Sequence, residues 1–182
     1  MIKYYIDANN LLEDAFRLAV IIHHSGYRPD LIIGVWRGGT PVAMAVHEYY
    51  EYKGIHTDHV AIRAASYTGI NARNKEVVVT GLEYVFERSR PEHQILIVDD
   101  VFDSGNSFRT ILEKLEAHYG SEIHARVRIA CPWYKPHNNR TTLVPDYFLH
   151  ETDDWLVFPH ELAGLTAEEI QQGKPAISRI IG

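Results

Sequence analysis

One stretch of thirteen residues, 95–107, constrains the fold of this chain more than any other segment. It begins with four apolar residues, continues through the acids Asp99, Asp100 and Asp103, and ends in a Ser-Gly-Asn-Ser turn before a helical pattern. A short continuous apolar run is typical of a strand that is buried on both faces of a parallel sheet. Because ligands bind beyond the carboxyl ends of such strands, we expect these acids to lie at a ligand site.

The turn that follows the acids has the features of a phosphate site. Backbone N–H groups and hydroxyls of small residues at a helix N-terminus surround an anion, and the helix dipole favours negative charge there. The residues expected to bind a monophosphate are Ser104, Gly105, Asn106 and Ser107. The carboxylates repel phosphate, and they instead accept hydrogen bonds from sugar hydroxyls or hold Mg²⁺. The pattern as a whole predicts a ribose 5-phosphate site, although an ordinary strand end and helix cap would explain the acids alone.

Length, charge and cysteine content restrict the class of protein. The 182 residues are 46% hydrophobic and 23% charged with a net charge of -6, as in one ordinary globular domain. Nucleic-acid binders need a basic surface, so we expect no nucleic-acid partner. The only cysteine, Cys131, excludes a disulfide within the chain. With no signal-peptide pattern and no apolar run near the ~20 residues of a membrane span, we expect a cytoplasmic protein without a membrane partner.

Alternating strand and helix patterns predict an α/β fold with a mostly parallel central sheet flanked by helices. The predicted strands are residues 31–35, 59–63, 76–79, 95–99 and 125–131, and the predicted helices run from Asp7 or Asn9 to Gly26, from 41 to 52 and from 107 to 118. Residues 66–75 are predicted to form a loop. Beyond Pro132 the chain becomes aromatic and rich in proline, so we expect residues 1–132 to form the core and 133–182 a small C-terminal hood of the same structural domain.

Residues 95–107 resemble the 5-phosphoribosyl-1-pyrophosphate (PRPP) signature of the type I phosphoribosyltransferases. The resemblance extends over about residues 31–161 and is closest to the 6-oxopurine (xanthine-guanine-hypoxanthine) enzymes. It implies the type I phosphoribosyltransferase fold with a hood. It also implies that Asp99 and Asp100 bind the ribose hydroxyls and that Asp103 acts in catalysis, accepting a proton near N7 of the purine as N9 attacks.

Two further loops of that family have counterparts in this chain. Arg37, Gly38 and Gly39 resemble the pyrophosphate-binding loop, in which glycines let the backbone approach an anion and the arginine pairs with phosphate oxygens. The resemblance implies a cis peptide between Arg37 and Gly38. Ser66 and Tyr67 resemble the start of the flexible loop that closes over the reaction centre and excludes water. A plain turn and an exposed hairpin are the alternatives for these two segments.

Three residues near the C-terminus resemble the purine-binding hood. Lys135 would donate to the 6-oxo group, Trp155 would stack on the ring, and Leu156 would contact the 2-position through its backbone. The chain departs from the bacterial xanthine-guanine enzymes at His160 and Glu161, which replace an aromatic-Asp pair. This departure leaves the preferred 2-substituent open.

The resemblance implies a purine-salvage enzyme that transfers the phosphoribosyl group of PRPP to N9 of hypoxanthine, guanine or xanthine and releases pyrophosphate. It implies Mg²⁺ as cofactor, held by Asp100 and Glu161, and a homodimer or homotetramer. One alternative is a PRPP-sensing, nucleic-acid-binding regulator on the same fold. The other is a phosphoribosyltransferase for adenine, orotate or uracil. The eleven histidines show no spacing typical of a structural zinc site.

Overall fold

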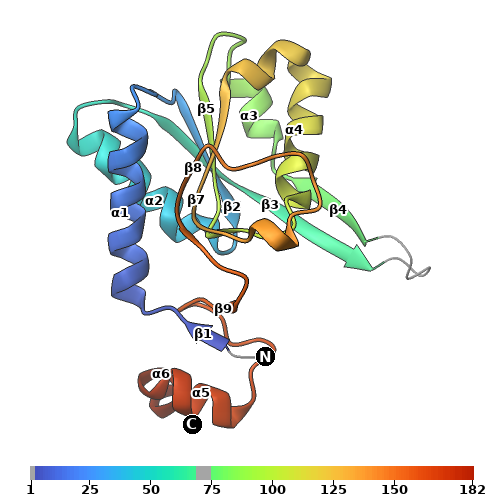
Figure 1. Cartoon of the computed structure of the whole chain (residues 1–182). Coiled ribbons are helices and arrows are strands. Elements are labelled where there is room, and N and C mark those ends of the chain that lie inside the picture. The colour runs from blue at the N-terminus through green and yellow to red at the C-terminus, as the bar shows by residue number, and fades with distance from the viewer. Residues whose placement is uncertain (1–2, 69–74) are drawn as a thin grey trace.

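A seven-stranded sheet forms the body of the protein (Figure 1). The structure, a computed structural model, describes residues 3–68 and 75–182. The strand order is β4-β3-β2-β5-β7-β6, and β8 pairs with β7. The strands are β2 (Leu31–Trp36), β3 (Asp58–Thr68), β4 (Lys75–Thr80), β5 (Ile95–Val98), β6 (Val101–Phe102), β7 (Val127–Tyr134) and β8 (Tyr147–Glu151). Among the described residues the β3–β4 pair is antiparallel and every other pair of this sheet is parallel, which confirms the predicted mostly parallel sheet.

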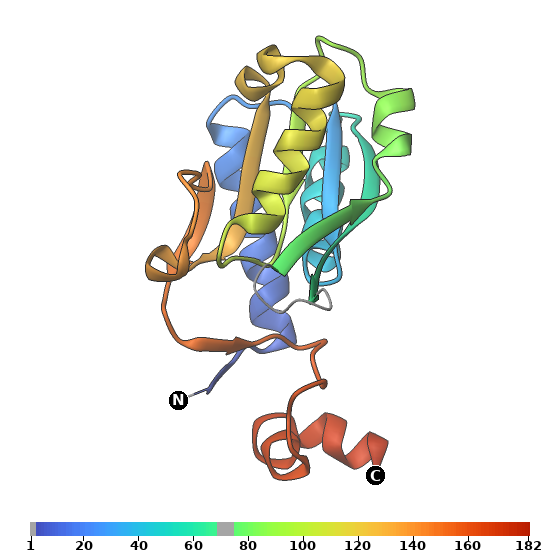
Figure 2. The same ribbon diagram turned by 90° about the vertical axis from the view of Figure 1, so that its right-hand side faces the viewer.

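Helices cover both faces of the sheet (Figure 2). α1 (Ala8–His24) and α2 (Gly39–Tyr52) pack on one face, and α3 (Glu83–Arg88) and α4 (Asn106–Tyr119) pack on the other. α1 begins as predicted, because the carboxylate of Asp7 accepts the backbone N–H of Asn9 at 2.8 Å and caps the helix. Within residues 3–68 and 75–182, no helix is both long and apolar enough to cross a bilayer.

The central strand β5 explains the unbroken apolar run of the sequence. Ile95 and Ile97 join the apolar layer under α4, while Leu96 and Val98 join the layer under α1 and α2. Side chains alternate along a strand, so a strand covered on both faces needs apolar residues at every position. All four side chains are fully buried. The residues that follow β5 therefore leave the middle of the sheet at its carboxyl edge.

The segment predicted as a loop, residues 66–75, is partly strand. β3 continues to Thr68 and β4 starts at Lys75, with Ser66 opposite Val77 in the antiparallel ladder. The two strands form a ribbon that projects beyond the helices (Figure 1). The end of β3, residues 66–68, and the first residue of β4, Lys75, are polar or aromatic and lack the apolar pattern on which strand prediction depends, which is why the prediction failed there. Residues 69–74 of the predicted loop lie outside the described residues.

A small second sheet builds the hood. β1 (Lys3–Tyr5) pairs in parallel with β9 (Trp155–Val157), so the N-terminal strand takes part in the hood, which the sequence had not indicated. Short 3-10 helices cover Ser121–Ala125 and Pro136–Asn138. Helices α5 (Ala167–Gly173) and α6 (Pro175–Ile181) form a C-terminal arm that extends away from the body (Figures 1 and 2). An ion pair of 2.5 Å between Lys3 and Glu169 ties the arm to β1.

Candidate active site

A polar cavity of about 600 Å³ lies at the carboxyl edge of the sheet. Its walls come from the β2–α2 turn, β3, the end of β5, the first turn of α4 and the chain beyond β9. The polar and glycine residues that line it are Arg37, Gly38, Arg63, Asp99, Asp100, Ser107, His160 and Glu161. Small-molecule sites range from roughly 300 to 1,000 Å³. The cavity thus brings together three segments that the sequence analysis predicted to form the site. It also includes Arg63 and His160, for which the sequence analysis predicted no role.

The acidic pair forms the floor of this cavity. The backbone N–H of Asp100 donates to Oδ1 of Asp99 at 2.9 Å, and Gly39 donates a further backbone hydrogen bond to Asp99. Burial, reinforced by the charge of Asp100, raises the pKa of Asp99 well above its usual range. Burial also raises the pKa of Asp100 to about 7, with a contribution from the charge of Glu161. Hydroxyl donors or a cation brought by a ligand would stabilise these carboxylates, so the pair is suited to a polyol or a metal.

Two glycines allow the β2–α2 turn to pass directly over the acids. A Cβ at Gly38 would overlap the carboxylate of Asp100. A Cβ at Gly39 would overlap the carbonyl oxygen of Val98 and lie 2.7 Å from Cα of Asp99. The sequence predicted these glycines for their approach to an anion. The structure shows that they are needed for the approach to the end of β5, which brings the neighbouring Arg37 into the cavity.

The expected cis peptide lies one position earlier than predicted. Among the described residues the cis peptide bond joins Trp36 to Arg37, whereas the resemblance implied Arg37 and Gly38. A cis bond is unfavourable before any residue other than proline, so residue types give no sign of which bond adopts it. The prediction was therefore wrong in position although it identified the correct loop.

The phosphate turn is shaped by one glycine. Gly105 has φ of 76°, and a Cβ there would lie 2.6 Å from Oγ1 of Thr141 and 2.9 Å from the ring of Phe102. No side chain caps α4 at this glycine. The first N–H groups of a helix have no partner within the helix, so the start of α4 can donate to an anion. The carbonyl of Ser104 accepts the N–H of Arg140 at 3.0 Å, which fixes the turn.

The third acid lies in a cluster beside the turn. The register of β6 on β7 pairs Phe102 with Tyr134, so Asp103 and Lys135 follow at adjacent strand ends. Nζ of Lys135 lies 3.7 Å from Oδ2 of Asp103, and Nδ2 of Asn138 donates to Oδ1 at 3.0 Å. Lys135 is buried and the Asp103 side chain is half exposed. A half-exposed carboxylate and a buried ammonium group thus lie side by side.

Comparison with known proteins assigns the chain to one family. The sequence profile described as "Phosphoribosyl transferase domain" matches residues 3–163. The chain belongs to the phosphoribosyl transferase domain family. No curated protein matches the sequence.

Several solved structures share the phosphoribosyltransferase fold of this chain. A purine phosphoribosyltransferase from Pyrococcus horikoshii is 28% identical, with a TM-score of 0.70 over 91% of this chain and 98% of its own. A hypothetical protein from Neisseria gonorrhoeae with bound ppGpp is 20% identical, with a TM-score of 0.73 over 96% of each chain. The xanthine-guanine-hypoxanthine phosphoribosyltransferase of Helicobacter pylori is 20% identical, with a TM-score of 0.67 over 86% of this chain and 92% of its own. The latter two show likeness of fold.

The predicted purine-binding residues of this phosphoribosyltransferase lie outside the cavity. Trp155 is 53% exposed and its ring centre lies 5.9 Å from Nζ of Lys3, whereas Leu156 is buried in the core. Asp103 and Lys135 do not line the cavity either. The structure therefore brings together the segments predicted for ribose, pyrophosphate and phosphate, whereas the residues predicted for the purine do not line the same cavity.

The chain beyond β9 contributes two side chains that do line the cavity. Nε2 of His160 lies 3.6 Å from Oδ2 of Asp100, and Glu161 accepts the backbone N–H of Phe158 at 3.0 Å. Burial lowers the pKa of His160, so the imidazole favours its neutral form. The contact between His160 and Asp100 depends on tertiary packing, and no local sequence pattern indicated it.

The predicted flexible-loop residues have a defined backbone position. Ser66 and Tyr67 lie in β3 as it leaves the sheet. Their side chains are outside what the structure describes. Arg63 lies earlier on the same strand, opposite Trp36 of β2, and faces the cavity.

Proposed function

We propose that this chain is a 6-oxopurine phosphoribosyltransferase, which transfers the 5-phosphoribosyl group of PRPP to N9 of hypoxanthine, guanine or xanthine and releases pyrophosphate. The observation that carries the choice of base is the pairing of buried Lys135 with Asp103 at 3.7 Å, next to the phosphate turn. The ammonium group of lysine donates a hydrogen bond to a 6-oxo group, but it cannot form this bond with a 6-amino group, which is itself a donor. The likeness to the purine enzyme of Pyrococcus horikoshii supports a purine acceptor.

The cavity supplies groups for each part of PRPP. The start of α4, with Ser104, Gly105, Asn106 and Ser107, would bind the 5′-phosphate. Asp99 and Asp100 would accept hydrogen bonds from the ribose hydroxyls. Burial raises the pKa of both carboxyls because it destabilises their ionised form, and hydrogen bonds from these hydroxyls would stabilise that form. The turn of Arg37, Gly38 and Gly39 would bind the pyrophosphate through the guanidinium and the backbone. Ser66 and Tyr67 would close over the centre and exclude water.

Asp103 would act on the purine. Its carboxylate would accept the proton near N7 as N9 attacks C1 of the ribose, while Lys135 holds the 6-oxo group and Trp155 stacks on the ring. Leu156 would contact the 2-position through its backbone. Trp155 is half exposed, and Nζ of Lys3 lies over its ring at 5.9 Å from the centre, so Lys3 would have to move for a base to stack on that face.

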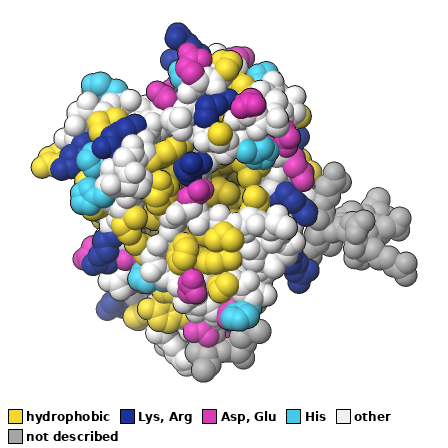
Figure 3. All heavy atoms as spheres, turned by 45° about the horizontal axis from the view of Figure 1, so that its top comes forward, with side chains coloured by type: hydrophobic (Ala, Val, Ile, Leu, Met, Phe, Trp, Pro, Cys, Tyr) yellow, Lys and Arg dark blue, Asp and Glu magenta, His cyan; other side chains and the backbone are white. Residues whose placement is uncertain are grey.

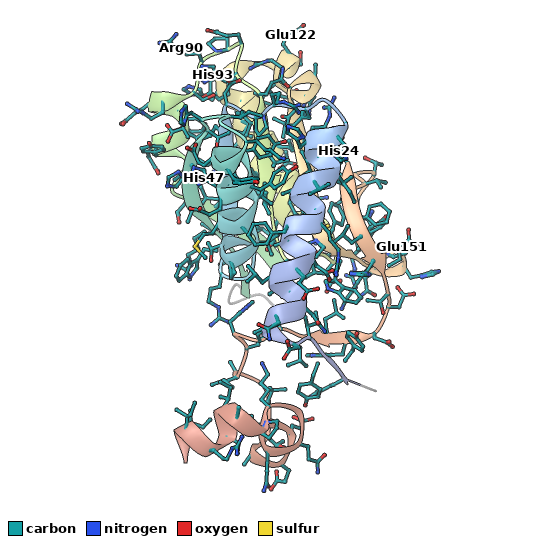
Figure 4. The ribbon with its side chains drawn as sticks, turned by 90° about the vertical axis from the view of Figure 1, so that its left-hand side faces the viewer. His24, His47, Arg90, His93, Glu122 and Glu151 are labelled. Carbon is teal, nitrogen blue, oxygen red and sulfur yellow. The ribbon has the colours of Figure 1, made fainter. Side chains whose placement is uncertain are left out.

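Mg²⁺ is the cofactor we propose, held by Asp100 and Glu161. Both carboxylates line the cavity, and the charge of Glu161 helps to raise the pKa of Asp100. Among residues 3–68 and 75–182, no group of three or more His, Cys, Asp or Glu residues can hold a metal, and His24, His47 and His93 lie far apart on separate segments (Figure 4). Mg²⁺ is characteristically bound by one or two carboxylates together with water and substrate phosphates, so the carboxylates of Asp100 and Glu161 are suitable ligands for it. When bound, the ion would neutralise the leaving pyrophosphate.

We propose a cytoplasmic homodimer or homotetramer whose partners are PRPP, the base and the nucleoside 5′-monophosphate product, without nucleic acid. On the face shown in Figure 3, basic side chains are scattered among acidic ones rather than gathered in a stripe. This distribution, with the net charge of -6, supports the absence of a nucleic-acid partner.

A panel of bases tests the proposed function. Pyrophosphate release is followed with PRPP, Mg²⁺ and each of hypoxanthine, guanine, xanthine, adenine, uracil and orotate. We expect activity with at least one 6-oxopurine and background rates with the other three bases. Activity confined to adenine or a pyrimidine would overturn the choice of base. No activity with any base, together with a salt-dependent gel shift on RNA or DNA, would favour a PRPP-sensing regulator.

Lys135→Met should reduce activity on 6-oxopurines selectively. Methionine keeps the length of the side chain but removes the donor, so the 6-oxo group of the base loses its hydrogen bond. We expect kcat/KM for the preferred base to fall about 10- to 100-fold, as for one charged hydrogen bond, with little change in KM for PRPP. Lys114→Met, on the far part of α4, serves as the control. Equal kcat/KM for Lys135→Met and the unaltered protein would remove Lys135 from the base site.

A further inference from the structure

A polar side chain that no sequence motif indicated contacts the proposed proton acceptor. Nδ2 of Asn138 donates to Oδ1 of Asp103 at 3.0 Å, whereas Nζ of Lys135 lies at 3.7 Å from Oδ2. The two carboxylate oxygens therefore have different partners. The amide makes the shorter contact, and it is neutral at every pH at which the enzyme folds.

The backbone around Asn138 holds this contact in place. The N–H of Lys135 donates to the carbonyl of Phe102 at 2.9 Å, and the N–H of Asn138 donates to the carbonyl of Lys135 at 3.2 Å. The 3-10 turn Pro136–Asn138 is thus attached to the strand that carries Asp103. It is also attached to the hood, because Nδ1 of His137 and Oδ2 of Asp153 form a hydrogen bond of 2.5 Å, two residues before Trp155 in the sequence. One turn therefore links the proton acceptor to the aromatic residue of the hood.

Lys135 and Asn138, the two partners of Asp103, would have different roles in the proposed reaction. Lys135 is needed at the 6-oxo group of the base, so its ammonium must turn from Asp103 to the purine. The Asp103 side chain is 49% exposed, and without a second partner it would then be free to rotate about its side-chain torsions. A donor that stays on Oδ1 keeps Oδ2 directed at the base when Lys135 leaves.

We propose that Asn138 is the positioning residue of this enzyme: it holds Oδ1 of Asp103 so that Oδ2 accepts the purine proton while Lys135 binds the 6-oxo group. The inference depends on the proposed function and adds to it a residue outside the PRPP motif, the pyrophosphate loop and the base-binding set. Asn138 does not touch the substrate. It acts through the orientation of Asp103.

Asn138→Ala tests the contact in the full-length protein. We expect kcat to fall about tenfold, the loss typical of one hydrogen bond to a charged group, with KM for PRPP unchanged. Asn139→Ala is the matched control, because the neighbouring amide bonds to Leu143, Tyr134 and Thr141 rather than to Asp103. That control should lower the melting temperature more than Asn138→Ala does while it leaves kcat near that of the unaltered protein.

Asn138→Asp gives a readout that loss of turn structure would not produce. The change keeps the size of the side chain but replaces the amide on Oδ1 of Asp103 by a second carboxylate, and Lys135 remains the facing cation. Like charges oppose ionisation, so the acid limb of the kcat profile should move to higher pH by about one unit. Gln171→Glu, an exposed position on α5, makes the same charge change far from the site and should leave the profile in place.

The outcomes separate this inference from the proposed function. Activity of the unaltered protein on 6-oxopurines, with reduced kcat in Asn138→Ala and a shifted profile in Asn138→Asp, supports both. An active protein in which both variants keep the unaltered kcat and pH profile overturns the role of Asn138 alone. An unaltered protein that is inactive on every 6-oxopurine overturns the proposed function and the role of Asn138 with it.

Discussion

Asp103→Asn should lower kcat about 100-fold or more, the usual size of a lost general base, while KM for PRPP stays nearly the same. The amide matches the carboxylate in shape but cannot accept the purine proton. Asp103 lies outside the cavity lined by the acid pair and the pyrophosphate turn, so the binding of PRPP should survive. Initial rates of pyrophosphate release at varied PRPP and varied base measure the two constants separately.

A chemically identical change elsewhere serves as the control for Asp103→Asn. Asp58 accepts hydrogen bonds from Tyr84 and lies at the start of β3, far along the chain from the site. Asp58→Asn should leave kcat unchanged. If Asp103→Asn retains turnover within a few-fold of the unaltered protein, another group must accept the proton, and the role of Asn138 loses its basis as well.

The sequence allowed five of the seven strands of the main sheet to be predicted, because burial leaves an apolar signal, whereas β6 and β8 were not predicted. β5 shows this best, since its four apolar residues supply both layers of the core. The hood was not predictable in the same way. β1 and β9 have three residues each and pair across the whole length of the chain, and so short a strand carries no periodicity of its own.

The site shows the same division between local and tertiary information. The acids and the turn before α4 occupy one continuous segment, so their position at the carboxyl end of a buried strand could be predicted from residue order alone. The adjacency of Asp103 and Lys135 depends on the parallel register of β6 with β7, which only the folded chain defines. Asn138 and His160 reach the carboxylates through the 3-10 turn and through the chain beyond β9, so no local pattern could indicate them.

Gly39→Ala should disrupt both the fold and the site. The added Cβ would overlap the carbonyl of Val98 and lie 2.7 Å from Cα of Asp99. Both are backbone atoms at the end of the central strand, which is packed on two faces and cannot shift to make room. We expect a loss of roughly 3 kcal/mol in the free energy of unfolding, at the upper end for overpacking, measured by urea denaturation. Binding of PRPP should fall too, because relief of the overlap displaces either the acid pair or Arg37.

Gly54→Ala distinguishes this steric effect from the general cost of replacing a glycine. Gly54 has φ of 72° and open space around its Cα, so alanine there meets only the strain of the left-handed conformation. That strain costs about 1–2 kcal/mol and should leave the site intact. Since Gly39 has no positive φ, its replacement carries no such strain, and any loss beyond that of Gly54→Ala must come from contact with β5. A Gly39→Ala protein as stable as the unaltered one, with unchanged affinity for PRPP, would show that the turn does not rest on the acidic strand end.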